Sequence, residues 1–436
     1  MPTKKNFLDN GAMVYTLELT ELLINKIKDK HNKLIKYLHI SLNASALLLI
    51  VNFIFPVYGA EVIYPNNDWE FRQPEDLGLP SDKVKKLIDL SFLDDSTQAV
   101  VIIKDGFLVA EKYAETYNAK SFGTSWSMAK SFYAALIGIS IDLGEIDSLD
   151  DKVSKYLNYY NDERKNITIR QILNMTSGLE FPENEHESMF FRYDQAKYAR
   201  EIGLEKQPEQ IFEYNNVNSM IIGEILKSVT GRNADMLLEE RIFDKIGIDE
   251  YTLWRDEAGN AMTYCCIDMS PRDYSRFGLL FSRGGKWNNE QVISNDFVNE
   301  TFSSYWDETP GWWTNEKRGY SLHWWISKND DEGIIFNASG KFGQYIFVDF
   351  KNDIIVTRIT KYHPMPGSIQ NWGFLKYIDV DNVDLWITIL RGLHGIGLID
   401  LTSDITTPNT YEDGESKEFY ENYGAIMDAI ADLSKE

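Results

Sequence analysis

Ser127 and Lys130 are the residues whose types and spacing best fit a chemical role in this chain. They stand at the start of an apolar stretch that we predict to be a helix from about Ser127 to Leu143, and side chains three residues apart share a helix face. The first turn of a helix favours negative charge, and burial lowers the pKa of an ammonium group. A neutral lysine can then take the serine proton and leave a nucleophile. The alternative is a capping serine beside a surface lysine.

Tyr214 and Asn216 form a second motif, in the sequence Tyr-Asn-Asn just before an apolar helix over about 217–229. A tyrosine beside an ammonium group can relay protons, and the asparagine can bind both lysine and substrate. The alternative is a packed aromatic ring followed by a helix cap, because asparagine caps helices well.

A third motif, Ala338-Ser339-Gly340-Lys341, interrupts a strand pattern. Glycine at such a position lets the backbone approach a ligand closely. A backbone N–H there and the N–H of Ser127 would together form an oxyanion hole. The alternative is an ordinary hairpin loop.

Other candidates for chemistry are weaker. The chain has no Gly-x-Ser-x-Gly motif, and His186-Glu187 lacks the second histidine of a zinc protease motif. His323, beside two tryptophans, is predicted to be a packed histidine.

The composition excludes some classes of function. The 436 residues carry a formal charge of −23, which repels phosphate backbones, so we expect no nucleic acid partner. The chain is 43% hydrophobic, enough for a sizeable core. Its two cysteines, Cys265 and Cys266, are adjacent, so we expect two small buried residues and no disulfide framework.

Residues 1–60 are predicted to be a leader, with a signal peptide over about 33–60. Lys33 and Lys36 precede a short apolar run and then small residues, which suits cleavage before Ala60. The apolar run is shorter than the roughly 20 residues of a membrane helix. We therefore expect a periplasmic or secreted protein, with membrane contact only if the leader is retained as an anchor.

The order of the elements that must position the motifs suggests a sheet built from both ends of the chain. Two β-branched runs over 97–113 flank Asp105-Gly106, which is a strong hairpin signal. A mostly helical region follows, strands return after residue 317, and a last helix spans about 416–434.

Together the three motifs resemble the serine β-lactamase and penicillin-binding-protein superfamily. They are most similar to its class-C-like esterases and amide hydrolases, such as 6-aminohexanoate-dimer hydrolase. Segments 167–178 and 270–278 also match this group, and the resemblance covers about 76–430. It implies an α+β fold of the β-lactamase type: an antiparallel sheet flanked by helices, plus an all-α subdomain, with the active site in the cleft between them.

This resemblance sets the expected domain limits. Residues 61–80 would form a linker, and 81–430 a β-lactamase-related catalytic domain. Within that domain the α/β part would span about 81–145 and 310–430, and the helical part about 146–309.

One position departs from the family pattern. Its β-lactamases and D,D-peptidases carry lysine or histidine in a Lys/His-Thr/Ser-Gly triad, where this chain has Ala338. Lys341 is a partial substitute. The missing cation disfavours substrates with a carboxylate, such as penicillins, and favours esters or other amides.

We therefore expect a serine hydrolase that cleaves a small ester or amide through an acyl-enzyme. Ser127 would be the nucleophile and Asn216 would orient the substrate, while Lys130 and Tyr214 would transfer protons, with the acylation base left open between them. By resemblance, the Lys341 N–H would contribute to the oxyanion hole. No metal or organic cofactor is needed. The alternatives are a β-lactamase or D,D-peptidase, and a non-catalytic module that binds cell wall or peptide.

Overall fold

The computed structural model describes residues 62–181, 189–190, 192–303, 306–309, 318–330, 333–361 and 417–435, together with residues 393, 396 and 398. The predicted leader lies outside these residues. No helix among those described is long and apolar enough to span a bilayer.

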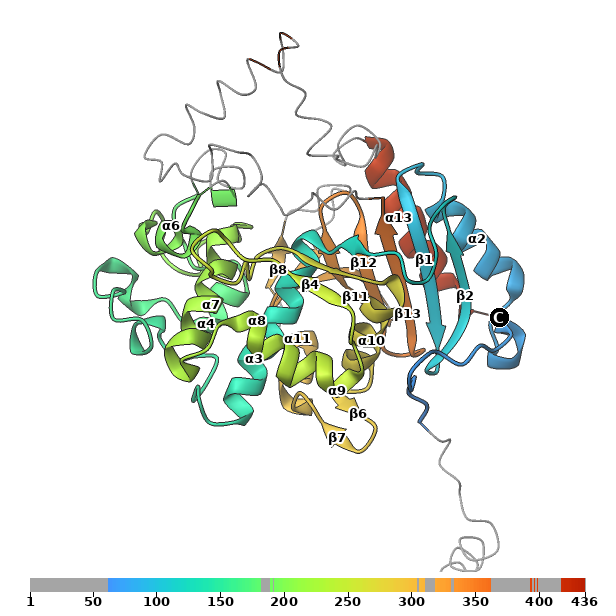
Figure 1. Ribbon diagram of the computed structural model, residues 1–436, viewed down its shortest axis with the longest axis horizontal. Helices are drawn as coiled ribbons and strands as arrows, with labels where there is room; N and C mark the ends of the chain where they lie inside the picture. The colour runs from blue at the N-terminus through green and yellow to red at the C-terminus, as the bar shows by residue number, and fades with distance from the viewer. Residues whose placement is uncertain are drawn as a thin grey trace, which may run out of the picture. The chain divides into compact units, whose positions relative to one another are not determined.

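An eight-stranded sheet in the order β2-β1-β13-β12-β11-β10-β9-β8 forms the centre of the fold (Figure 1). Its pairings are all antiparallel. The strands are β1 (Thr97–Lys104), β2 (Phe107–Tyr113), β8 (Trp306–Thr309), β9 (Arg318–Ser321), β10 (Trp324–Asp330), β11 (Gly333–Gly340), β12 (Gln344–Asp349) and β13 (Ile354–Thr360). Because β1 pairs with β13, the prediction of a sheet built from both ends of the chain is confirmed.

The first hairpin follows its sequence signal. β1 and β2 meet at Asp105 and Gly106, whose φ angles of 53° and 84° both lie in the left-handed region. This pattern suits a two-residue hairpin turn. Nearly every residue of β1 is buried because both faces of the sheet are covered.

Helices lie on both sides of the sheet (Figure 1). They are α2 (Ser81–Ser91), α3 (Ala129–Asp142), α4 (Ile169–Leu173), α6 (Gln195–Glu201), α7 (Asn216–Thr230), α8 (Ala234–Leu238), α9 (Asp244–Ile246), α10 (Pro271–Ser282), α11 (Asn295–Ser303) and α13 (Lys417–Asp432), with short turns η1 (Pro74–Leu77), η2 (Trp126–Met128), η3 (Val153–Lys155), η4 (Glu163–Asn166) and η5 (Glu239–Phe243). One core cluster joins α2 and α13 to the sheet, and a larger cluster joins the other face to α3, α10 and the remaining helices. The predicted α+β class is confirmed.

Close packing holds α10 on the sheet. A Cβ at Gly278 would lie 2.7 Å from Ile355 and 2.8 Å from Ile346, so only glycine lets the helix approach β12 and β13 this closely. Ser270 caps this helix, since its side chain accepts a hydrogen bond from the Asp273 N–H.

A three-stranded sheet of β3 (Gly123–Thr124), β5 (Ile267–Met269) and β4 (Tyr251–Leu253) leads the chain into η2. The Ser125 N–H donates to the Ile267 carbonyl at 2.8 Å, and the Ile267 N–H donates to Ser125 Oγ at 2.8 Å. A separate two-stranded sheet pairs β6 (Lys286–Trp287) with β7 (Glu290–Gln291).

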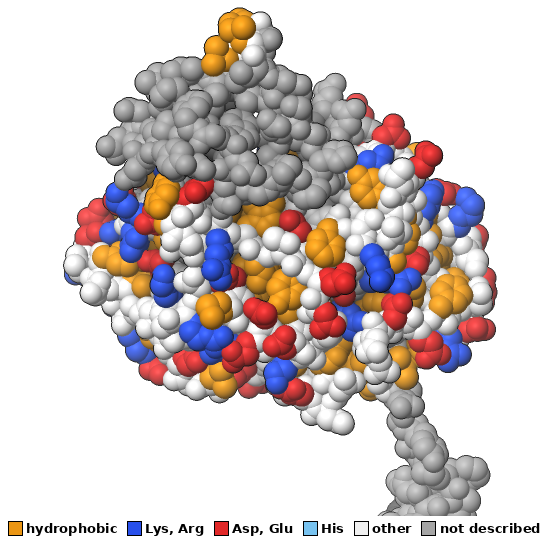
Figure 2. Space-filling view, in the orientation of Figure 1, with side chains coloured by type: hydrophobic (Ala, Val, Ile, Leu, Met, Phe, Trp, Pro, Cys, Tyr) orange, Lys and Arg blue, Asp and Glu red, His pale blue; other side chains and the backbone are white. Residues whose placement is uncertain are grey.

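The two cysteines are buried, as predicted. Because Cys265 and Cys266 are neighbours in the chain, their two sulfur atoms lie in contact. On the face shown in Figure 2, acidic and basic side chains are interspersed and do not form a large basic patch.

Candidate active site

Ser127 lies in a short turn that brings the chain from the small sheet into α3. The turn is the 3₁₀ segment η2, so Ser127 precedes the α-helix, and the predicted helix start is wrong by about two residues. Trp126, just before the serine, has a φ of 46°. That is an uncommon conformation for a residue other than glycine, and it occurs often at functional sites.

Lys130 lies within hydrogen-bonding distance of Ser127. Its Nζ donates to Ser127 Oγ at 2.9 Å and to the Tyr264 carbonyl at 2.7 Å. The lysine is only 1% exposed, because α3 is buried on all sides from Ala129 to Ser140 and is not amphipathic. The structure thus places a serine hydroxyl and a buried amine in direct contact.

Tyr214 covers the lysine. Lys130 Nζ lies 5.0 Å from the centre of the Tyr214 ring, which is within the range of a cation–π interaction. The ring stacks on Trp325 at 5.5 Å and meets the edge of Tyr320 at 6.2 Å. These aromatic contacts hold the phenol over the amine.

Asn216 opens α7 two residues after the tyrosine and is 5% exposed. The cap of this helix is its neighbour Asn215, whose side chain accepts a hydrogen bond from the Val217 N–H at 2.9 Å. The helix covers the predicted stretch 217–229 and ends before Gly231. Asn215 therefore caps the helix, so helix capping does not explain why an asparagine stands at position 216.

The end of β11 packs against the serine turn. A Cβ at Gly340 would collide with the carbonyl oxygen of Ser125, so this contact requires glycine. Just beyond β11, the Phe342 ring meets the edge of Trp126 at 5.5 Å, and Phe342 also has a positive φ, of 66°. The turn that carries Lys341 and the turn that carries Ser127 are thus neighbours.

The predicted gap in positive charge is visible on β11. Ala338 is fully buried in the main core cluster, and it shares a strand face with Gly340 because side chains alternate along a strand. Lys341 is exposed, with its Nζ 4.9 Å from the centre of the Phe342 ring. The face of β11 toward the serine turn therefore carries only the methyl group of Ala338 and the hydrogen of Gly340, and neither is charged.

Two buried ionisable groups flank the site. Burial, with a further contribution from Lys130, holds the pKa of His323 well below its usual 6.5. Burial raises the pKa of Asp268 from 3.8 to about 6, against hydrogen bonds from Thr124 and Trp254 that lower it. His323 is thus neutral, and its predicted packing in the core is confirmed, at 2% exposure.

Sequence reasoning missed the groups that hold the lysine and the serine turn. The Tyr264 carbonyl binds Lys130, and the Trp126–Phe342 contact joins the two turns. A backbone carbonyl leaves no signal in residue types. The described residues contain no group of three or more His, Cys, Asp or Glu side chains that could hold a metal ion.

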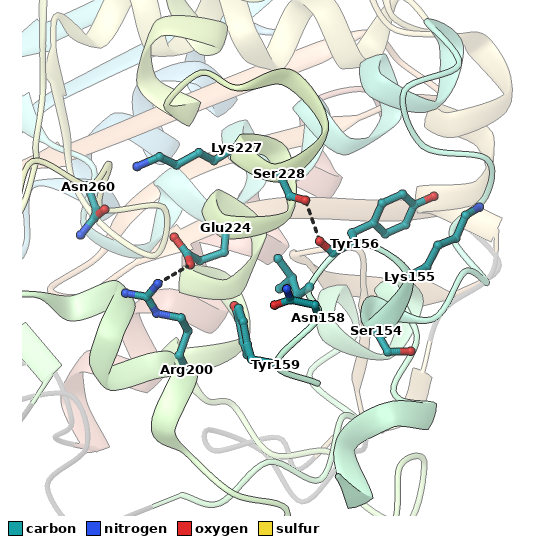
Figure 3. Close-up of a pocket in the computed structure, with 11 residues that line it drawn as sticks. Ser154, Lys155, Tyr156, Asn158, Tyr159, Arg200, Glu224, Lys227, Ser228 and Asn260 are labelled. Atoms are coloured by element: carbon teal, nitrogen blue, oxygen red, sulfur yellow. Dashed lines mark hydrogen bonds and ion pairs between the residues drawn. The ribbon is translucent and has the colours of Figure 1, made fainter. Parts of the chain in front are cut away.

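A cavity of about 540 Å³ lies near the other end of α7 (Figure 3). Its lining is polar, and it includes Arg200 and Glu224, whose charged groups lie 3.5 Å apart. None of the predicted site residues lines this cavity. It is therefore separate from the candidate active site.

Residues 95–374 match the family model Beta-lactamase. That match covers more than half of the chain and includes all the predicted site residues. The chain belongs to the Beta-lactamase family.

Solved structures of this family share the fold. A protein of Bacillus anthracis assigned by name as a 6-aminohexanoate-dimer hydrolase has a TM-score of 0.57 and 19% identity, over 78% of this chain and 90% of its own. A D-stereospecific amidohydrolase from Streptomyces sp. has a TM-score of 0.53 and 17% identity, over 64% of this chain and 94% of its own. The fold is therefore β-lactamase-like, as predicted.

Curated relatives have a higher sequence identity than these structures, but over shorter segments of both chains. A D-aminopeptidase of Brucella anthropi is 27% identical over 184 residues, which are 37% of this chain and 33% of the relative. The chain spans 66% or less of the length of the curated relatives it matches. The family match and the shared fold make this chain β-lactamase-related, and several of the similar proteins are hydrolases by name.

Proposed function

We propose that this protein hydrolyses an ester or an uncharged amide through an acyl-enzyme formed on Ser127. The observation that carries the proposal is the contact of 2.9 Å between Lys130 Nζ and Ser127 Oγ, in a buried setting beneath the Tyr214 ring. A hydroxyl beside an amine is an activated nucleophile, because the amine can take the proton as the oxygen attacks.

The acylation step follows from these positions. Acylation requires the acceptor in its deprotonated form, because an ammonium group cannot take a proton. Ser127 Oγ then attacks the carbonyl carbon, its proton passes to the neutral Lys130 amine or to the Tyr214 phenolate, and the carbonyl oxygen becomes an oxyanion. Lys130 makes the direct contact with the serine, which favours it as the proton acceptor. When the intermediate collapses, the bond to the leaving group breaks and Tyr214 gives its proton to the leaving group. Where Lys130 took the serine proton, it passes that proton on to Tyr214, so both groups return to their starting states. Water then attacks the acyl-enzyme, releases the acid and restores the serine.

The substrate must be held while these bonds change. The N–H groups of Ser127 and Lys341 are proposed to stabilise the oxyanion, supported by the contact of Gly340 with the serine turn. Asn216, buried at the start of α7, is proposed to orient the substrate. The methyl group at Ala338 gives no cation for a substrate carboxylate, which supports esters and uncharged amides over β-lactams.

The named neighbours support the same class. One is a D-stereospecific amidohydrolase, and another is a family VIII carboxylesterase. We also propose that the protein acts in the periplasm or outside the cell, because residues 33–60 have the pattern of a signal peptide.

A labelling experiment tests the proposal. The full chain is treated with a fluorophosphonate probe, and we expect labelling of the wild type and none of Ser127→Ala. Ser140→Ala is the control: it removes a buried serine of α3, the helix that follows the Ser127 turn, and should label like the wild type. Equal labelling of wild type and Ser127→Ala would refute the proposal.

Turnover then separates the substrate classes. We expect hydrolysis of p-nitrophenyl butyrate that is lost in Ser127→Ala, and little hydrolysis of a chromogenic cephalosporin. Rapid turnover of the cephalosporin would favour a β-lactamase. Tight binding of a cell-wall fragment with no turnover of any ester or amide would favour a binding module.

A further inference from the structure

The hairpin between β9 and β10 turns through Leu322 and His323, which link the paired residues Ser321 and Trp324. Their φ angles are 43° and 66°, both in the left-handed region. Hairpin turns of this kind usually contain glycine or asparagine, because other side chains are strained there. The surrounding structure must therefore hold this turn in place.

Three hydrogen bonds from two helical segments hold it. The Leu322 N–H donates to Asn174 Oδ1 at 2.8 Å, and the His323 N–H donates to the Leu173 carbonyl at 3.0 Å. The Ser131 hydroxyl donates to the His323 carbonyl at 2.6 Å. Ser131 is the residue after Lys130, so the turn is tied to the helix that carries the proposed catalytic lysine.

The His323 side chain extends the link to α7 and back to β9. Nε2 lies 3.1 Å from Ser219 Oγ, and Nδ1 lies 3.2 Å from the Tyr320 hydroxyl. A neutral imidazole has one donor and one acceptor. Both contacts are satisfied in either tautomer, because each of the two hydroxyl groups can donate or accept.

The Tyr320 ring carries the link to the proposed proton donor. Its ring meets Tyr214 nearly at a right angle, at 6.2 Å, and meets Trp325 at 4.7 Å. Since Tyr214 also stacks on Trp325, the phenol packs against both of these rings. The hydroxyl of Tyr320 is bound to His323, so its ring cannot slide without breaking that hydrogen bond.

We propose that His323 is a positioning residue: it ties α3, α7 and β9 together and, through Tyr320, holds the Tyr214 phenol at its place over Lys130. This inference rests on the proposed function, in which Tyr214 gives a proton to the leaving group. His323 acts through Tyr320 and does not itself touch the substrate.

Leaving-group dependence tests the inference. An ethyl ester needs a proton on its departing oxygen, whereas a p-nitrophenyl ester of the same acid releases a stable anion. A misplaced Tyr214 should therefore slow the ethyl ester selectively. The assay is kcat/KM, which reports acylation, for ethyl butyrate and p-nitrophenyl butyrate.

Two variants remove the link without touching Tyr214. His323→Asn accepts the left-handed backbone but is too short to reach both partners, and Tyr320→Phe removes only one hydroxyl. We expect each to lower kcat/KM for the ethyl ester by about 10- to 100-fold, because small displacements of a catalytic group have effects of this size. For the p-nitrophenyl ester we expect a loss below about 3-fold.

Tyr423→Phe is the matched control. It removes a buried phenol hydroxyl that accepts from Asn337 Nδ2 at 2.8 Å, within the core cluster of α2 and α13. A purely structural effect would slow both esters alike, so this control should leave the ratio of the two kcat/KM values unchanged.

The outcomes separate the two proposals. If Tyr214→Phe shifts the ratio while His323→Asn and Tyr320→Phe do not, the positioning role is overturned and the hydrolase stands. If Ser127→Ala hydrolyses both esters like the wild type, the proposed function fails and the positioning role fails with it.

Discussion

Asp268 should make the stability of this protein depend on pH in a defined window. The carboxylate lies on β5 with 6% exposure, and it accepts hydrogen bonds from the Thr124 hydroxyl and, at 2.8 Å, from Trp254 Nε1. Burial raises its pKa from 3.8 to about 6. Between these two values the folded state binds more protons than the unfolded state. Stability from this group is therefore present below pH 4 and is lost as the pH rises through 6.

The size of the effect follows from the two pKa values. The full shift corresponds to about 3 kcal/mol at 1.36 kcal/mol per pKa unit, of which about 1.4 kcal/mol is lost between pH 5 and pH 8. Asp268→Asn removes the titration and keeps both hydrogen bonds: the amide oxygen accepts from Trp254, and the amide nitrogen donates to the Thr124 hydroxyl. The unfolding free energy of the variant should therefore not fall by this amount between pH 5 and pH 8.

Urea unfolding at pH 5 and pH 8 measures the difference. The wild type should lose about 1.4 kcal/mol more unfolding free energy between these pH values than Asp268→Asn does. Asp82→Asn, at an exposed position of α2, is the control and should behave like the wild type. Parallel pH profiles for wild type and Asp268→Asn would refute the reasoning, because the carboxyl would then titrate alike in both states.

Three further substitutions give distinct readouts. Lys130→Met should lower kcat/KM by about 10²- to 10⁴-fold, the usual range for loss of a proton-transfer group, with urea unfolding as the check on folding. Gly340→Ala forces a methyl group against the Ser125 carbonyl, so we expect about 100-fold lower kcat/KM; Gly424→Ala, which meets no atom within 4 Å, should have no such effect. Arg358→Met removes the guanidinium that lies 2.7 Å from the buried Asp94 carboxylate and so leaves that carboxylate without a cation. It should lower the free energy of unfolding, measured in urea, by about 3–5 kcal/mol.

Local signals in the sequence predicted most of the elements. Asp105-Gly106 marked the first hairpin, and the apolar pattern over about 217–229 marked α7. In each case a few neighbouring residues determine the conformation, so no knowledge of distant contacts was needed. The spacing of Ser127 and Lys130 likewise predicted their contact, because residues three apart in a 3₁₀ turn or a helix lie on the same side.

The remaining features depend on contacts between distant segments. The left-handed backbone of Trp126 is held by its packing on Phe342, more than two hundred residues away. The acceptor for Lys130 is the Tyr264 carbonyl, a backbone group whose residue type is irrelevant. A single-sequence pattern cannot report such pairings, and for the same reason it could not show that the buried His323 links three elements.

The balance of charge around Ser127 limits which substrates the proposed mechanism favours. Ala338 and Gly340 present no charge on the strand face beside the serine turn, and Lys341 is exposed to solvent. An exposed cation attracts a carboxylate weakly, because water and salt screen the interaction. The proposed mechanism therefore gains little from a substrate carboxylate and loses nothing when that carboxylate is absent, which is why we expect a neutral ester or amide to be a better substrate than a penicillin.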